Sequence, residues 1–174
     1  MTIDAGLLTL RLIIGLVVAA HGAQKLFGFS GGPGFAKTIK FTENLGFRPA
    51  PVWAALAGGG EFFGGLGLAL GLLMPLPAVA IVAAMGVVVF RAHWKNGFWG
   101  TKGGFEYGLV LGLVAAVLGL INPGKYSLDA LFGLHLPAAP VFWIGSLLAL
   151  ISIVVSLTVG ARTARTDAAG QRAA

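Results

Sequence analysis

Five ionisable side chains lie within or at the ends of long apolar stretches, where charged groups are unusual and need a physical reason. They are Arg11, His21, Glu61, His93 and Glu106. A charged group in hydrocarbon is costly, so it is found where it pairs with another polar group, moves protons or binds a ligand. Glu61 is the strongest candidate, because it lies between Gly58-Gly59-Gly60 and Gly64-Gly65, and such small residues leave room for a ligand or a partner.

Simpler roles for these residues stay open. Arg11 can extend to the outer membrane surface, and His21 can hydrogen-bond to a neighbouring helix. His93 and Glu106 can be solvated at the membrane boundary. Depths in the membrane can be estimated from a helical rise of ~1.5 Å per residue. By this estimate His21, Glu61, His93 and Glu106 lie in one half of the bundle, and Arg11 lies deeper in the membrane than they do. We therefore predict a polar site in that half, in which Arg11 could pair with Glu61 and tune its charge.

The segment from His93 to Gly100 is rich in aromatic residues and glycine. It reads His93-Trp94-Lys95-Asn96-Gly97-Phe98-Trp99-Gly100 and runs into Gly103-Gly104-Phe105-Glu106-Tyr107. Tryptophans at a membrane boundary usually form an interfacial belt. The polar residues between them could also form a rim for a flat aromatic head group such as a quinone, and the two roles are compatible. The rim candidates are Lys25, Trp94, Asn96, Trp99 and Tyr107.

The chain has no redox chemistry in its own side chains. It contains no cysteine, which excludes thiol relays and iron–sulfur clusters. Its histidines and carboxylates are suitable metal ligands, but they lack a diagnostic spacing, so we predict no metal site and do not favour a haem. Any redox role must use a bound quinone or a redox partner.

The elements that must position these residues are transmembrane helices. Apolar residues make up 57% of the chain and charged residues 10%, against roughly 25% charged in a soluble domain. We predict an all-α integral membrane helical bundle over residues 1–160. Segments of about 20 apolar residues cross a membrane, and the predicted spans are 5–27, 52–74, 76–93, 105–121 and 139–160. A short amphipathic helix over 34–45 would lie in the interface, and the tail 161–174 is predicted to be disordered.

The basic residues predict how the bundle is oriented. Ten of the twelve would lie on one side of a bundle with five spans, and the opposite side carries Lys125. By the positive-inside rule that basic side is cytoplasmic, which places the N-terminus outside and the C-terminus inside. This distribution explains the net charge of +6 without nucleic acid as a partner. The ten are Lys25, Lys37, Lys40, Arg48, Arg91, Lys95, Lys102, Arg162, Arg165 and Arg172.

Several of these motifs together resemble the DoxX family of small bacterial membrane proteins. They are Leu10-Arg11-Leu12, His21-Gly22-Ala23-Gln24-Lys25-Leu26-Phe27-Gly28, Gly59-Gly60-Glu61 with Gly64-Gly65, His93 to Trp99, and Gly103 to Tyr107. Their order and spacing cover about residues 5–122. The resemblance implies a four-helix core in the plasma membrane, to which the segment 139–160 would add a fifth helix. It also implies a role in membrane redox or oxidative-stress systems, as in the membrane subunit of a thiosulfate–quinone oxidoreductase.

We therefore expect a quinone-facing or anchoring subunit of such a system, with a soluble redox partner at the cytoplasmic face. No self-contained catalytic motif is present. Two alternatives use the same residues differently. A small-solute or proton-coupled transporter would move its cargo through the polar half of the bundle. A non-enzymatic scaffold would recruit soluble proteins through the basic loops.

Overall fold

The computed structural model describes the backbone of residues 2–173 and the side chains of residues 3–162. Within this part all regular elements are helical, and four of them are long and apolar enough to cross a membrane, which confirms the all-α membrane bundle. The longer helices are α1 (Thr2–Phe27), α3 (Ala50–Leu70), α4 (Leu76–Val87, continued by a π-helical turn over Val88–His93), α5 (Glu106–Leu120) and α7 (Ala138–Ala173). Two shorter helices, α2 (Gly34–Asn44) and α6 (Leu128–Phe132), lie in the connections.

Helix α5 is shorter than the span predicted over residues 105–121. It has 15 residues, which at ~1.5 Å per residue is about 22 Å, less than the ~30 Å hydrocarbon core of a bilayer. It is therefore not among the four helices of spanning length. Proline, glycine and asparagine follow it at 122–124, and the helix ends before them.

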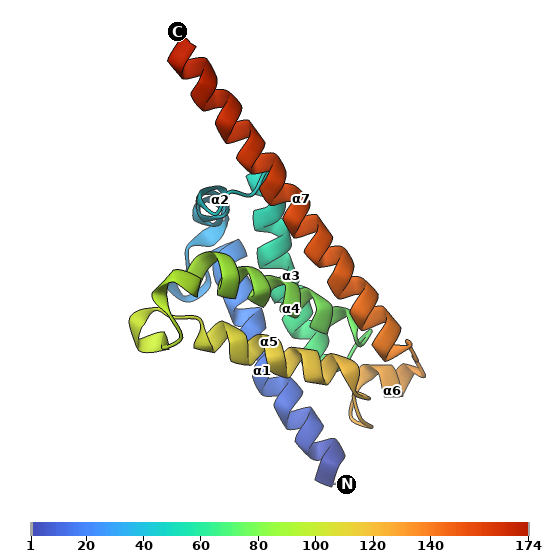
Figure 1. Ribbon diagram of the computed structural model, residues 1–174. Helices are drawn as coiled ribbons and strands as arrows, with labels where there is room; N and C mark the ends of the chain where they lie inside the picture. Colours follow the sequence, from blue (N-terminus) through green and yellow to red (C-terminus); the bar gives the residue numbers. More distant parts are fainter. Residues whose placement is uncertain (1, 174) are drawn as a thin grey trace.

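The chain nevertheless runs along the bundle five times. After α5, the Asp129 carboxylate accepts hydrogen bonds from the backbone of the α3–α4 turn, so α5 ends where α4 begins. Ser156 of α7 hydrogen-bonds to Arg48 just before α3, so α7 returns to the opposite end. The start of α1 and the end of α7 accordingly lie at opposite ends of the molecule (Figure 1).

Helix α7 continues through the tail that the sequence predicted to be disordered. It extends from Ala138 to Ala173, well beyond residue 161. Alanine and arginine are good helix formers and are frequent after residue 160, so the composition allows the helix to continue. The side chains after Arg162 lie outside the described part of the structure.

Glycines bring α1 and α3 into backbone contact. A Cβ atom on Gly65 would lie 2.4 Å from the nitrogen of Ala19 and 2.5 Å from the oxygen of Gly15. A Cβ atom on Gly22 would lie 2.3 Å from the nitrogen of Phe62. These positions therefore require glycine, by the same small-residue packing that joins membrane helices generally. The two contacts fix how α1 is rotated and shifted against α3, and so which α1 side chains face Glu61.

The apolar core lies between α1, α3, α4, α5 and α7, and the outer surface is also apolar. Ten buried side chains form the core: Val18, Leu68, Met74, Ala78, Ile81, Met85, Leu111, Ala115, Leu118 and Phe142. On α7, Trp143, Ile144 and Leu148 are each more than half exposed. A helix with apolar side chains on its outer face is expected where lipid replaces water.

Candidate functional site

An ion pair joins α1 to α3 in the half of the bundle where a polar site was predicted. The ammonium group of Lys25, in the last turn of α1, donates a hydrogen bond to Oε1 of Glu61. Glu61 is 1% exposed, and the Lys25 side chain 24%. Oε2 of Glu61 is buried without a hydrogen-bond partner. An opposite charge offsets part of the cost of burying a carboxylate, and the second oxygen remains free to accept a hydrogen bond.

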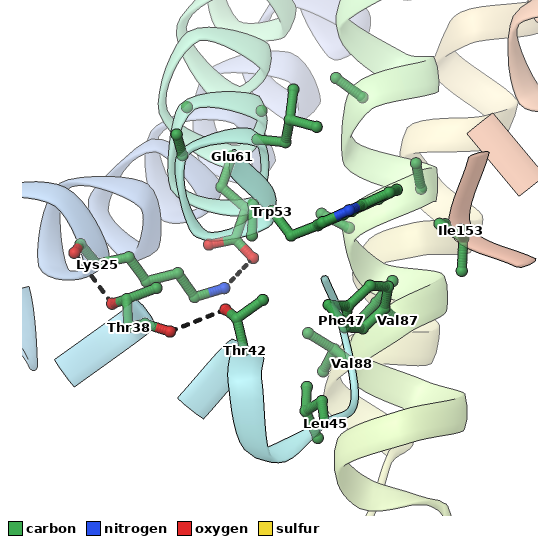
Figure 2. Close-up of a pocket in the computed structure, with 18 of the residues that line it drawn as sticks. Lys25, Thr38, Thr42, Leu45, Phe47, Trp53, Glu61, Val87, Val88 and Ile153 are labelled. Atoms are coloured by element: carbon green, nitrogen blue, oxygen red, sulfur yellow. Dashed lines mark hydrogen bonds and ion pairs between the residues drawn. The ribbon is translucent and has the colours of Figure 1, made fainter. Parts of the chain in front are cut away.

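Helix α2 covers this ion pair with two threonines (Figure 2). Thr38 and Thr42 are buried. The Thr38 hydroxyl lies 3.1 Å from the Lys25 carbonyl and 2.9 Å from the Gly34 carbonyl, and the Thr42 hydroxyl donates to the Thr38 carbonyl at 2.8 Å. The helix predicted over 34–45 is thus present. The face it turns to the bundle carries threonines, whereas Phe35 and Phe41 are exposed.

A cavity of about 420 Å³ lies beside the ion pair, between α2, α3, α4 and α7. Figure 2 shows Glu61 and Lys25 on one side of it, with Trp53 between Glu61 and the helix that carries Val87. The other walls are mostly apolar and include Leu45, Phe47, Leu56, Val87, Val88 and Ile153. Leu56 is 57% exposed, so the cavity reaches the outer surface of the bundle. A mostly apolar cavity with a few polar groups on one wall is typical of a small-molecule site.

His21 lies outside this cavity and contacts α5. Its Nε2 lies 3.2 Å from the Tyr107 hydroxyl, and the two rings pack edge to face with centroids 5.7 Å apart. Neither residue lines the cavity. Nor does the described part of the chain contain three His, Asp or Glu side chains placed to hold a metal ion. His21 and Tyr107 therefore form a separate contact between α1 and α5.

The aromatic segment after His93 folds into a loop of its own. The Gly103 carbonyl lies 2.7 Å from His93 Nδ1 and accepts a hydrogen bond from Asn96 Nδ2 at 2.9 Å. Trp94 stacks on Phe105 with ring centroids 5.0 Å apart, and Trp99 is exposed. None of these residues lines the cavity, nor does Glu106. Of the ten residues singled out from the sequence, the structure brings only Lys25 and Glu61 to the cavity.

Arg11 does not pair with Glu61. It is fully buried, and its Nη2 donates to the carbonyl of Tyr126, at the other end of the bundle. The carboxylate that attracts it is Asp129, which also accepts hydrogen bonds from Leu73 N at 2.7 Å and Met74 N at 2.8 Å. Asp129 was not among the residues singled out from the sequence. A local pattern could have indicated it, because serine at a helix N-cap followed by an acidic residue in the first turn is typical of a helix start. Ser127 caps α6 by accepting a hydrogen bond from the nitrogen of Ala130, and the acidic residue is Asp129.

Comparison with known proteins identifies one family. The sequence profile of the DoxX family matches residues 6–94, which is 89 of 174 residues and covers α1 through the end of the π-helical turn. Lys25, Glu61 and the threonines of α2 lie within this match, whereas α5, α6 and α7 lie beyond it. Neither a curated protein nor a solved structure matches the chain. On the evidence of its first four helices, the chain belongs to the DoxX family.

Proposed function

We propose that this protein is a quinone-binding subunit of a membrane redox system, with the quinone head group beside Lys25 and Glu61. The observation that carries the proposal is an apolar cavity whose wall includes a charged donor, Lys25, and a carboxylate, Glu61, with one buried oxygen that has no hydrogen-bond partner. A quinone carbonyl could accept from the Lys25 ammonium. A quinol hydroxyl could donate to the unpartnered Oε2 of Glu61. Ionised partners make such hydrogen bonds stronger than neutral ones.

The same pair would handle the protons of the reaction. Reducing a quinone to a quinol takes two electrons and two protons. The Lys25 ammonium would donate a proton to a quinone oxygen during reduction, and the Glu61 carboxylate would accept the proton that a quinol hydroxyl releases during oxidation. Lys25 is 24% exposed, so its ammonium group can exchange protons with water. The electrons would come from a soluble redox partner. With ten basic residues predicted on the cytoplasmic side, an acidic surface on that partner would be attracted to this face.

The ligand would enter from the lipid rather than from water. Leu56 and Phe41 line the cavity and are 57% and 50% exposed. Both are apolar, so this route suits a lipid-soluble molecule. On the side of α2, the buried threonines lie over the ion pair and restrict access for water.

The test is a binding titration of the full-length protein in lipid nanodiscs with a short-chain benzoquinone. Glu61→Gln and Lys25→Met should each weaken binding by about tenfold or more, because a hydrogen bond to a charged group contributes about 1.5–3 kcal/mol. Glu106→Gln is the matched control, since Glu106 does not line the cavity, and its affinity should stay unchanged. Circular dichroism would show that each variant keeps its helices.

Two results would contradict the proposal. The first is unchanged affinity in Glu61→Gln. The second is quinone uptake by the protein nanodiscs that does not exceed uptake by nanodiscs of lipid alone.

A further inference from the structure

Trp53 supplies an aromatic wall of the cavity beside the Lys25–Glu61 pair. It lies in the first turn of α3, is partly buried and lines the same cavity as the two charged residues. Its indole ring extends from α3 toward the helix that carries Val87 (Figure 2). The cavity therefore combines a charged pair with a flat, electron-rich ring.

Phe47 packs against this indole ring. The two ring centroids lie 5.0 Å apart, and the ring planes are tilted by 35°. Phe47 also lines the cavity but is only 1% exposed, so it is itself largely closed to a ligand. Because Phe47 covers one face of the indole, a ligand in the cavity meets the other face.

Helix α7 fixes the segment that carries Phe47. The Ser156 hydroxyl donates a hydrogen bond to the Arg48 carbonyl at 3.0 Å and accepts one from the Arg48 nitrogen at 3.2 Å. On the other side of Phe47, a Cβ atom on Gly160 would lie 2.1 Å from the oxygen of Gly46, so the two backbones are in contact. Phe47 is thus held from both sides. A ring that is already in place loses little freedom when a ligand packs on it.

We infer that the ligand's head group stacks on Trp53, and that the site prefers a head group of two fused rings, a naphthoquinone, over the single ring of a benzoquinone. This inference rests on the proposed function and adds the class of quinone. An indole has two fused rings, so its face can overlap both rings of a naphthoquinone. Stacked aromatic rings attract each other beyond the effect of the area they bury. At about 420 Å³, the cavity is in the size range of small-molecule sites and has room for two rings.

The spacing of Trp53 and Glu61 along α3 also favours the longer head group. The two residues are eight positions apart, which is about 12 Å along the helix axis. Long side chains on a helix lean toward its N-terminus, so the Glu61 carboxylate lies closer to the level of the indole than this distance. A head group of two rings covers more of the remaining gap than one ring does.

The charged pair itself does not distinguish the two classes. Both quinones carry two carbonyl oxygens on opposite sides of one ring, and each can accept the same hydrogen bond from Lys25. A preference between them must therefore come from the wall that the second ring contacts, and we assign it to Trp53.

The experiment compares a methyl-substituted benzoquinone with the matching methyl-substituted naphthoquinone. Both are titrated into full-length protein in nanodiscs, and each affinity is corrected for the concentration of that quinone in the bilayer. The wild-type protein should prefer the naphthoquinone by about fivefold. Trp53→Leu should reduce the preference to less than about twofold, and Trp53→Phe, which keeps one aromatic ring, should give an intermediate value.

Two further variants separate stacking from the contacts of the charged pair. Glu61→Gln should weaken the binding of both quinones by a similar factor and keep the preference. Trp143→Leu makes the same change as Trp53→Leu at an exposed residue of α7 that does not line the cavity, and it should behave as the wild type. Circular dichroism checks that each variant keeps its helices.

The inference is overturned if the wild type binds both quinones equally, or if Trp53→Leu and Trp53→Phe both keep the full preference. In either case, a loss of affinity in Glu61→Gln would still leave the head-group site beside Lys25 and Glu61 intact. Binding of neither quinone overturns the proposed function as well.

Discussion

Lys25 of α1 reaches across the α1–α3 contact to Glu61, whose carboxylate is almost fully buried. Its ammonium group donates a hydrogen bond to one carboxylate oxygen, and the other oxygen has no hydrogen-bond partner. The pair connects the predicted site to the packing of the bundle. Gly22 is in backbone contact with Phe62, next in sequence to Glu61. Lys25 lies one helical turn after Gly22, so this contact holds its ammonium group within reach of the Glu61 carboxylate. The geometry of the site therefore depends on glycines that themselves bind nothing.

Removing one partner of the pair should destabilise the protein more than removing both. Lys25→Met leaves Glu61 buried and charged without a partner, and we expect a loss of about 2–3 kcal/mol, below the 3–5 kcal/mol of a fully buried pair because Lys25 is partly exposed. Adding Glu61→Gln to Lys25→Met should recover most of that loss. Unfolding by sodium dodecyl sulfate in mixed micelles, followed by circular dichroism, measures both. A double variant no more stable than Lys25→Met would contradict the pairing.

Adding one methyl group at Gly65 should disrupt the bundle. The new Cβ atom would collide with backbone atoms of Ala19 and Gly15, which cannot move aside as a flexible side chain can. We expect Gly65→Ala to cost about 3 kcal/mol or more. Gly86→Ala is the control, because its Cβ atom meets nothing within 4 Å, and alanine is the better helix former. The same unfolding measurement applies, and equal stabilities for the two variants would refute the close contact of α1 and α3.

Asp129→Ala should loosen the end of the bundle opposite to the cavity. It removes the acceptors for the backbone nitrogens of Leu73 and Met74 and leaves Arg11 buried without a nearby carboxylate. Unsatisfied buried groups cost about 1–3 kcal/mol each, so the loss should exceed about 2 kcal/mol. Hydrogen exchange at Leu73 and Met74 should become faster. Asp4→Ala serves for comparison, because Asp4 accepts one bond, from Lys125 N at 3.0 Å, at an exposed position. Unchanged exchange in Asp129→Ala would show that these bonds do not hold the turn.

His21 should have no part in quinone binding. It was predicted to share a site with Glu61, but it hydrogen-bonds to Tyr107 and does not line the cavity. We expect His21→Phe and Tyr107→Phe to leave the affinity for a short-chain benzoquinone within about twofold of the wild type. The titration used for Glu61→Gln measures it. If His21→Phe loses as much quinone affinity as Glu61→Gln does, then His21 is part of the binding site.

Trp53 should report the bound ligand. It is the only one of the four tryptophans that lines the cavity, and quinones quench indole fluorescence at short range. Saturable quenching by a benzoquinone should be present in the wild type and lost in Trp53→Phe. The variants Trp94→Phe, Trp99→Phe and Trp143→Phe should keep it. If Trp99→Phe instead loses the saturable component, the aromatic loop holds the quinone, as the sequence first indicated.

Local patterns in the sequence were enough to predict the helices and to single out Glu61, which the structure buries at the wall of the cavity. Long apolar stretches indicated the bundle, and Pro33 and Gly46 enclosed a short amphipathic segment that is indeed helical. Glu61 stood out because nothing polar surrounds it along the chain. The partners were not predictable in this way. Arg11 and Lys25 lie on nearly the same face of α1, about 21 Å apart along its axis. Which of them meets Glu61 therefore depends on how far α1 is shifted along α3, and the glycine contacts decide this in three dimensions.

The hydrogen-bond partner of Arg11 shows the same difficulty. The Tyr126 carbonyl lies far along the chain, and the loop that carries it folds back over the start of the bundle. No spacing along the sequence relates the two residues. The fold of the aromatic segment after His93 was not predictable either: His93 and Asn96 both contact the Gly103 carbonyl within the loop, and these residues do not line the cavity.

The limited length of α5 also has a consequence for the lipid around it. At about 22 Å it falls roughly 8 Å short of an average hydrocarbon layer, yet it runs alongside helices that are long enough. A helix that is too short is accommodated when the leaflets draw together beside it. We therefore expect the bilayer to be locally thinner beside α5. We also expect the protein to be enriched in membranes, or regions of a membrane, that are already thin.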